Sequence, residues 1–295
     1  MYMESNRLIV AVDGGGSTCR VSICDPSGAV VGAARGGSAN ITTDLNIALA
    51  NITDTAHRAY DAAGLPATRM AEDFAYLGLA GASRKGAAAQ TESALGFHKV
   101  KVTSDREITV QGAMGDDDGT VAAIGTGSFF VSRLKDKVIN IGGWGFQLGD
   151  DCGGALLGRK LLRQTIHAYD GIAAHSQLTQ QILDRFGGTP HGLVAFVQTA
   201  SPMDYGEFSP SLIEAYYAGD VNALKIVKSA VALLHHTLEH LNAEKTGALY
   251  MLGGLGPIYK ELLRPEYQAI CVPPKGTASD GAIALAQQHW RGDFT

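Results

Sequence analysis

Cysteine is scarce in this sequence: there are four in 295 residues, and no two of them form a Cys-x-x-Cys pair. Disulfide frameworks and zinc ribbons depend on cysteines that are numerous or closely spaced. The distribution therefore argues against both as the basis of the fold, and the core has to come from apolar packing alone.

Long apolar runs are also missing. No segment reaches the roughly 20 consecutive apolar residues that a membrane-spanning helix needs. The first residues, Met1 to Arg7, lack the long apolar stretch of a secretory signal. We therefore predict a cytoplasmic protein without a membrane partner.

The sequence has no excess of positive charge. It contains 24 Lys and Arg against 29 Asp and Glu, which gives a formal net charge of −5. Nucleic acid is a poor partner for such a chain, because binding it requires a basic surface. A phosphorylated ligand would have to be held by local donors.

Two familiar nucleotide motifs are absent as well. There is no Gly-x-x-x-x-Gly-Lys-Ser/Thr, and no Gly-x-Gly-x-x-Gly that opens a helix. What the chain has instead is two short loops rich in Gly, Ser and Thr, at Asp13–Thr18 and Gly125–Ser128. Glycine lets backbone N–H groups approach an anion closely, and hydroxyl groups add donors. A single loop of this kind is usually only a tight turn. Two such loops, each between two strands, are stronger evidence for phosphate binding than one.

The duplication extends to the strands around the loops, and Gly125 follows Asp13 by about 112 positions. Each copy reads as strand, loop, strand, turn, strand, at 7–12, 19–24 and 29–33 and again at 120–124, 129–134 and 138–141. A repeat on this scale indicates two similar halves, since solenoid repeats are about 20–50 residues long. We predict an α/β protein with domains at 1–115 and 116–295 and an acidic hinge at Gly115–Gly119.

The remaining elements follow from periodicity and turn residues. Helices are expected at 44–63, 85–95, 106–114 and 221–242, the last within a mostly helical insert over about 156–242. Strands are expected at 74–79, 100–103, 249–252 and 269–272. Ser279 is predicted to cap a final helix, at 279–292, that packs on the N-terminal domain.

Three segments carry a family resemblance: Val12–Thr18, Ile124–Ser128 and Gly142–Asp151, in that order. Together they resemble the N-acetylglucosamine kinase branch of the actin-like ATPase superfamily, the BadF/BadG/BcrA/BcrD ATPases. The similarity runs from Val12 to Ala282. It implies duplicated ribonuclease-H-like domains, ATP in the interdomain cleft, and closure on sugar binding.

The resemblance implies ATP and Mg²⁺ as cofactors. Asp13 would lie near the metal-bound phosphates and contact Mg²⁺ through water, which suits a cation that keeps several waters. The alternative is that Asp13 caps its own turn. The residues that would contact ATP are Gly14, Gly15, Gly16, Ser17, Thr18, Gly125, Thr126, Gly127, Gly253, Gly254 and Leu255. For Gly253–Leu255, a plain strand-to-helix turn is the alternative.

Asp105 matches the catalytic base of the family, at the carboxyl end of a strand where a helix begins. Phosphoryl transfer depends on positioning and charge stabilisation, with one carboxylate accepting the proton of the attacking hydroxyl. An aspartate at this point of the chain is also a good helix N-cap, and that alternative stays open.

The sugar would be bound by Asn40, Asp105, Ser128, Gly143, Trp144 and Asp150, according to the same resemblance. Amide and carboxylate groups make the paired hydrogen bonds that vicinal hydroxyls need. The alternatives are an Asx turn at Asn40 and a helix cap at Asp150. Asp151 departs from the glutamate common in the family, and Cys152 follows it.

Two further clusters are candidate metal sites. His236 and His240 have ligand spacing on the predicted long helix, but no third ligand is evident in the sequence. Asp116–Asp118 could bind a cation, although a solvated hinge is the better interpretation.

The function that follows is ATP-dependent phosphorylation of an amino sugar, N-acetylglucosamine or glucosamine, at its 6-hydroxyl. One alternative is an ATPase that activates an acyl-CoA dehydratase or reductase through a bridging iron–sulfur cluster, with Cys152 as the candidate ligand. Another is a non-catalytic sugar sensor. The acceptor stays open among N-acetylglucosamine, glucosamine, N-acetylmannosamine and glucose, and an apolar surface on the helical insert could form a homodimer.

Overall fold

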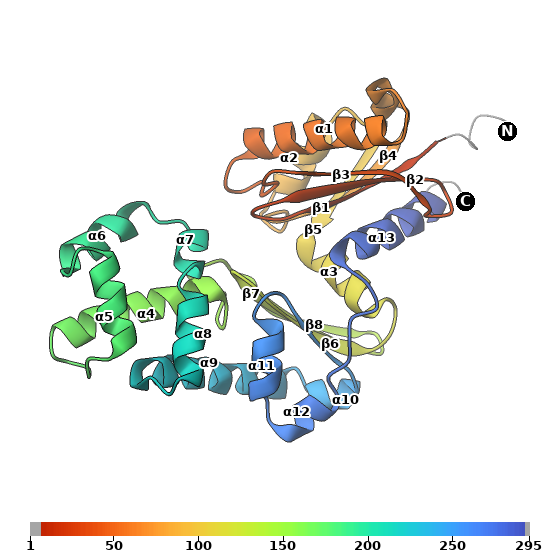
Figure 1. Ribbon diagram of the computed structural model, residues 1–295. Coiled ribbons are helices and arrows are strands. Elements are labelled where there is room, and N and C mark those ends of the chain that lie inside the picture. The colour runs from red at the N-terminus through yellow and green to blue at the C-terminus, as the bar shows by residue number, and fades with distance from the viewer. Residues whose placement is uncertain (1–6, 293–295) are drawn as a thin grey trace. The chain divides into compact units, whose positions relative to one another are not determined.

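The structure, a computed structural model, describes residues 7–292 and divides into two compact units. Unit 1 comprises Met1–Asp116 and Pro274–Thr295, and unit 2 comprises Asp117–Pro273. Each unit is built on one β-sheet with helices packed against it (Figure 1). The prediction made for the N-terminal segment falls largely on residues 1–6, which lie outside the described residues.

Unit 1 contains a five-stranded sheet in the order β3-β2-β1-β4-β5. Its strands are β1 (Ile9–Gly14), β2 (Cys19–Cys24), β3 (Val30–Gly36), β4 (Phe74–Leu79) and β5 (Lys99–Ser104). The first three strands pair antiparallel, whereas β4 pairs parallel to both β1 and β5. Since parallel strands end at one edge of a sheet, Asp13 and Asp105 lie at the same edge.

Helices cover both faces of this sheet. They are α1 (Leu45–Ala62), the 3₁₀ helix η2 (Ala67–Ala71), α2 (Ala87–Ala94), α3 (Asp105–Met114) and α13 (Ala278–Gly292). Side chains alternate along a strand, so Val10 and Val12 of β1 pack with α1 while Ile9 and Ala11 pack with α3 and α13. Figure 1 shows α1 and α13 on opposite sides of the sheet.

Unit 2 repeats the pattern with a four-stranded sheet in the order β8-β7-β6-β9. Its strands are β6 (Gly119–Ile124), β7 (Ser128–Leu134), β8 (Lys137–Gly142) and β9 (Leu249–Leu252). Three strands again pair antiparallel and the fourth pairs parallel to the first. The predicted α/β duplication is therefore confirmed.

The helices of unit 2 lie mostly between β8 and β9 in the chain. They are α4 (Gly154–Tyr169), α5 (Gln177–Arg185), α6 (Pro190–Thr199), α7 (Pro202–Gly206), α8 (Ser209–Tyr217), α9 (Val221–His240), α10 (Ala243–Thr246), α11 (Gly256–Leu262) and α12 (Pro265–Ala269). Helix α9 buries Val227, Leu234 and Leu238, which lie on one face at helical spacing. None of the helices within residues 7–292 has the length and apolar character to cross a bilayer.

The strand predicted at 269–272 is wrong. Residue Ala269 ends α12, and only an isolated parallel bridge joins Leu249 to Cys271. Pro273 and Pro274 follow directly, and proline has no N–H to extend a ladder of hydrogen bonds. The apolar residues that suggested a strand therefore form a single bridge to β9 and no longer ladder.

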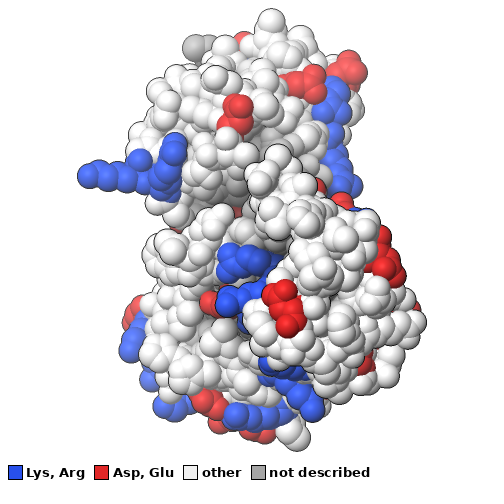
Figure 2. Space-filling view, turned by 90° about the vertical axis from the view of Figure 1, so that its left-hand side faces the viewer, with Lys and Arg blue, Asp and Glu red and all other residues white. Residues whose placement is uncertain are grey.

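Charged side chains of both signs are interspersed over the face of the molecule in Figure 2, with uncharged surface between them. This distribution agrees with the small negative net charge of the sequence.

Candidate active site

Asp13 lies at the carboxyl end of β1 and is held by two donors. Its Oδ2 accepts a hydrogen bond from Arg20 Nη1 at 3.0 Å and from Ser279 Oγ at 3.2 Å. Arg20 is the cross-strand partner of Asp13 in β2. The interpretation of Asp13 as a cap of its own turn is wrong, because both of its hydrogen-bond donors come from outside that turn.

Ser279 does not cap α13, contrary to our prediction. The residue that opens the helix is Thr277, whose Oγ1 accepts from the N–H of Asp280, while the Asp280 carboxylate accepts from the Thr277 N–H at 2.7 Å. This reciprocal pair satisfies the first turn. Ser279 lies within that turn, and its hydroxyl is directed to Asp13.

Asp105 is the first residue of α3, but it is not the helix cap. Ser104 has the extended backbone of an N-cap, and its side chain accepts from the N–H of Glu107. The capping alternative for Asp105 is therefore wrong, since its neighbour performs that role.

The pKa of the partly buried Asp105 carboxyl is raised above its ordinary value. Burial is the largest cause, and the negative charge of Asp13 adds to it, while the backbone N–H and the charge of Arg106 act in the opposite direction. A carboxylate with a raised pKa accepts a proton more readily than an exposed one. The surroundings of Asp105 thus increase the affinity of its carboxylate for a proton.

The loop after β1 contains glycines with different requirements. A Cβ at Gly14 would overlap Leu79 and Ala39, so packing demands glycine there. A Cβ at Gly16 would meet no heavy atom within 4 Å, and the φ of Gly16 lies outside the left-handed region. Neither packing nor backbone conformation therefore requires glycine at position 16.

Asn40 forms the Asx turn that we considered as the alternative to sugar binding. Its Oδ1 accepts from the N–H of Thr42 at 3.0 Å and from the Thr42 hydroxyl at 2.7 Å. These bonds fix the orientation of the amide. They also direct any contact with a ligand to the Nδ2 donor.

Three loops of unit 2 meet at the carboxyl end of β6. Gly154 N–H donates to Gly125 O at 2.8 Å, and Leu255 N–H donates to Ile124 O at 3.0 Å. Gly253 has a φ of 81°, and a Cβ there would overlap the Ile124 carbonyl. Gly254, like Gly16, has open space around it and no left-handed φ.

The loop Gly142–Asp151 leads from β8 toward α4. Trp144 is 79% exposed on this loop, and the N–H of Gly143 donates to Ser128 O at 2.9 Å. The hydroxyl of Ser128 donates to the backbone carbonyl of Asp151. The loop is therefore tied by its backbone to the start of β7.

Asp150 has a left-handed backbone, with a φ of 58°. Its carboxylate lies against the loop Gly125–Ser128, because a Cβ on Gly127 would come within 2.6 Å of Asp150 Oδ2. The interpretation of Asp150 as a helix cap is wrong, since α4 begins at the N-cap Gly153.

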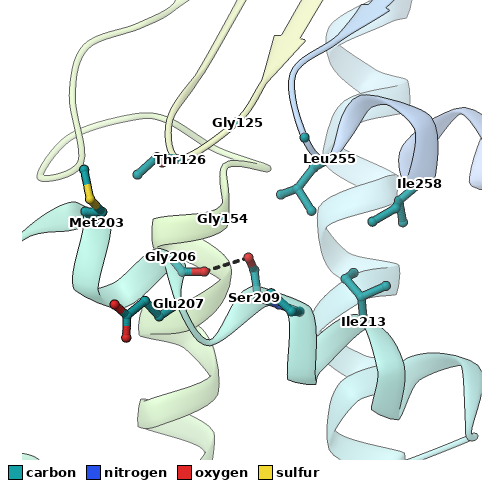
Figure 3. Close-up of a pocket in the computed structure, with 12 residues that line it drawn as sticks. Gly125, Thr126, Gly154, Met203, Gly206, Glu207, Ser209, Ile213, Leu255 and Ile258 are labelled. Atoms are coloured by element: carbon teal, nitrogen blue, oxygen red, sulfur yellow. Dashed lines mark hydrogen bonds between the residues drawn. The ribbon is translucent and has the colours of Figure 1, made fainter. Parts of the chain in front are cut away.

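A pocket of about 580 Å³ opens within unit 2 (Figure 3). Gly125 and Thr126 line one side and Leu255, Ile258 and Ile213 the other, while the Ser209 hydroxyl donates to Gly206 O at 2.7 Å. The lining residues are Gly125, Thr126, Gly154, Met203, Gly206, Glu207, Ser209, Pro210, Ile213, Gly254, Leu255 and Ile258. The pocket thus joins a loop that contains glycine and threonine to an apolar wall.

Helices α7, α8 and α11 contribute to this pocket, and their contributions are not predictable from the sequence alone. They were interpreted as parts of a helical insert or of a turn, because their residues carry no motif. The pocket does include four of the residues predicted to contact ATP: Gly125, Thr126, Gly254 and Leu255.

Cys152 is 2% exposed and unsuited to bind a cluster. Its Sγ donates to Ala230 O at 3.4 Å, and burial raises the pKa of the thiol to about 12. A metal ligand has to be a thiolate that can reach the metal, whereas this thiol is buried and protonated at neutral pH.

The two histidines weighed as a zinc pair, His236 and His240, are both exposed on α9. Across residues 7–292, no group of three or more His, Cys, Asp and Glu side chains is arranged to hold a metal ion.

The duplicated sheet, with a glycine-rich loop after the first strand of each copy, is the α/β fold of the actin-like ATPases. A profile of the BadF/BadG/BcrA/BcrD ATPase family matches residues 10–260. The chain belongs to this family.

The curated proteins that this chain matches include sugar kinases. The chain is 31% identical over 278 residues to glucosamine kinase GspK of Vibrio cholerae, covering 94% of this chain and 95% of that protein. It is 27% identical to an N-acetylmuramic acid/N-acetylglucosamine kinase of Clostridium acetobutylicum, over 52% of this chain and 53% of that protein. A crystal structure from Chromobacterium violaceum, provisionally named an N-acetylglucosamine kinase, superposes with a TM-score of 0.87 at 29% identity, covering 96% and 99% of the two chains.

Proposed function

We propose that this protein is a kinase that transfers the γ-phosphoryl group of ATP to the 6-hydroxyl of an amino sugar, glucosamine or N-acetylglucosamine. The observation that carries the proposal is Asp105, a carboxylate with a raised pKa at the same sheet edge as Asp13. The names of the relatives support the substrate class.

Asp105 would accept the proton of the sugar hydroxyl as that oxygen attacks phosphorus. The base acts only when ionised, and its raised pKa increases its affinity for the proton it has to accept. Asn40 Nδ2 and Asp150 would orient the sugar, with Ser128, Gly143 and Trp144 shaping the surface around it.

Asp13 would hold Mg²⁺ through water, and the bound ion would supply positive charge against the phosphate oxygens. The residues fit, since Mg²⁺ in kinases is bound by one or two carboxylates together with waters and phosphates. Arg20 is a further residue for this role that the sequence analysis did not single out. Its guanidinium pairs with Asp13 beside the glycine loop, where it can contact a phosphate.

The pocket of unit 2 would bind the nucleotide. Leu255, Ile258 and Ile213 form an apolar wall suited to adenosine, and Thr126 on the other side would offer its hydroxyl to phosphate. Gly14–Thr18 is proposed as a second phosphate loop.

Gly16→Ala is expected to raise the KM for ATP about tenfold. The added methyl group would keep the phosphate from approaching the backbone N–H, and one charge-assisted hydrogen bond to phosphate contributes about 1.5 kcal/mol or more. The melting temperature should be unchanged or slightly higher, since alanine fits the open space and restricts the unfolded chain. Steady-state kinetics and a thermal melt check both parts. An unchanged KM for ATP would remove Gly16 from the phosphate loop.

The activating ATPase is not favoured. Its only candidate ligand, Cys152, is a buried and protonated thiol. A sugar sensor would need no base, whereas Asp105 has the burial and charge environment of one. The cytoplasmic location, the homodimer and the domain limits at 1–115 and 116–295 stay predictions.

An ADP-release assay with ATP and Mg²⁺ tests the function. Glucosamine, N-acetylglucosamine, N-acetylmannosamine and glucose are offered in turn, with EDTA as the control. We expect turnover with glucosamine or N-acetylglucosamine that EDTA abolishes. ADP release without sugar dependence would instead favour an ATPase, and sugar binding without ADP release a sensor.

A further inference from the structure

Phe146 is the inward-facing residue of the loop Gly142–Asp151. Trp144 and Leu148 on the same loop are 79% and 89% exposed, whereas Phe146 packs against the helical core of unit 2. Its ring lies 4.9 Å from the ring of Tyr205, centroid to centroid. Phe146 therefore anchors a loop whose other large side chains face solvent.

Arg159 of α4 clamps Phe146 in place. Its guanidinium carbon lies 4.7 Å from the centroid of the Phe146 ring, and its Nη1 donates to the Phe146 carbonyl at 3.3 Å. The first contact holds the side chain by a cation–π interaction and the second holds the backbone. Arg159 thus fixes both the position and the orientation of the loop anchor.

Tyr205 belongs to α7, which forms part of the wall of the nucleotide pocket. Its neighbours Met203 and Gly206 both line that pocket. Helix α7 packs directly on α4 at Gly158, where a Cβ would overlap the Tyr205 carbonyl. Two successive residues of α4 therefore contact two different parts of the protein: Gly158 contacts α7 in the pocket wall, and Arg159 contacts Phe146 in the loop.

In this arrangement, a displacement of α7 would also displace α4 and Phe146. The backbones of α4 and α7 are in contact at Gly158, and the Tyr205 ring contacts the Phe146 ring. Packed cores transmit small shifts because they contain little free volume. A nucleotide that moves the pocket wall would move the loop that carries Trp144.

We propose that Phe146 is a positioning residue that couples nucleotide binding in the unit 2 pocket to the conformation of the loop Gly142–Asp151. The inference rests on the proposed function, since that function assigns nucleotide to the pocket and sugar to the loop. Arg159 and Tyr205 are the two contacts through which Phe146 acts.

Trp144 is a built-in reporter for this coupling. The chain contains two tryptophans, and the other, Trp290, packs on Phe74 in unit 1. In a Trp290→Phe background, the emission of Trp144 can be followed during titration with ADP alone. Calorimetry measures ADP binding in the same sample, and glucosamine binding is then measured with and without ADP.

We expect ADP to change the emission of Trp144 and to raise glucosamine affinity about fivefold or more, a usual strength for coupling between sites. Phe146→Leu should reduce the coupling to less than about twofold and diminish the emission change, while ADP still binds. Arg159→Met, which keeps an apolar stem, should act in the same direction. Tyr205→Phe, which retains the ring contact, is the matched control and should behave like the parent.

A merely structural role for Phe146 gives a different result. Phe146→Leu would then weaken glucosamine binding equally with and without ADP, and that outcome overturns the inference. ADP binding that leaves Trp144 emission unchanged in the parent protein also overturns it while leaving the kinase proposal intact. Failure of ADP to bind at all would overturn both. If Phe146→Leu does not fold, Arg159→Met alone decides between coupling and its absence.

Discussion

Asp105→Asn is expected to lower kcat by about 10²–10⁴-fold, the usual contribution of a general base. The substitution keeps the size and the hydrogen-bonding shape of the side chain but cannot accept the proton of the sugar hydroxyl. Steady-state kinetics with ATP and glucosamine measure the change. A kcat within tenfold of wild type would mean that Asp105 is not the base.

The same variant should be more stable than the wild type at neutral pH. The pKa of Asp105 is higher in the folded protein than in the unfolded chain, so the folded protein binds a proton at this carboxylate more tightly. Ionisation of Asp105 above the unfolded pKa therefore costs stability, and asparagine removes that cost. A thermal melt at pH 7 and another below the ordinary aspartate pKa of about 3.9 check the sign.

Ser104→Ala is the matched control one residue away. It removes the side chain that caps α3, and the loss of such a cap costs about 0.5–2 kcal/mol. We expect lower stability with a much smaller loss of turnover, the reverse of the pattern for Asp105→Asn. The pH profile adds a further check, since the acidic limb of kcat/KM in the wild type should lie above the ordinary aspartate pKa and be absent from the asparagine variant.

Gly253→Ala is expected to lower the free energy of unfolding by about 3 kcal/mol or more, combining left-handed strain with a steric clash. The φ at this position is 81°, and the new Cβ would overlap the backbone of Ile124. Because Leu255 N–H donates to Ile124 O at 3.0 Å, the clash would also separate two sides of the pocket. Denaturant unfolding measures the loss.

Gly254→Ala makes the same chemical change at the next residue. A Cβ there meets nothing within 4 Å, so stability should be unchanged. Gly254 lines the pocket, so nucleotide affinity should fall in this variant. Equal stability losses in the two variants would contradict the distinction between a structural and a ligand-facing glycine.

Much of the fold follows from local sequence. The strands predicted at 19–24, 74–79 and 249–252 have the predicted bounds, because their apolar runs end at clear turn residues. The duplication can be recognised in the sequence because each copy places its glycine loop between two short strands. The strand predicted at 269–272 was wrong because its apolar residues close one bridge and then meet two prolines.

The candidate site was less predictable, because much of it depends on contacts between distant segments. Ser279 reaches Asp13 across 266 positions of sequence, and no local pattern reports such a contact. The residues of α7 and α8 in the pocket carry no motif, and they become adjacent to Gly125 only when α4 and α7 pack. At Asp105 the local rule was misleading. Aspartate at the start of a helix is a common N-cap, but in the structure Ser104 caps α3.

The central claim is that this protein forms a sugar phosphate, and phosphorus NMR tests it directly. The protein is incubated with ATP, Mg²⁺ and, in separate samples, glucosamine or N-acetylglucosamine, and the ³¹P spectrum of each sample is followed over time. We predict that the γ-phosphorus signal of ATP gives way to a phosphomonoester coupled to the protons on C6 of the sugar, with ADP formed in step. If both samples yield only inorganic phosphate, or consume no ATP, that result would contradict the claim.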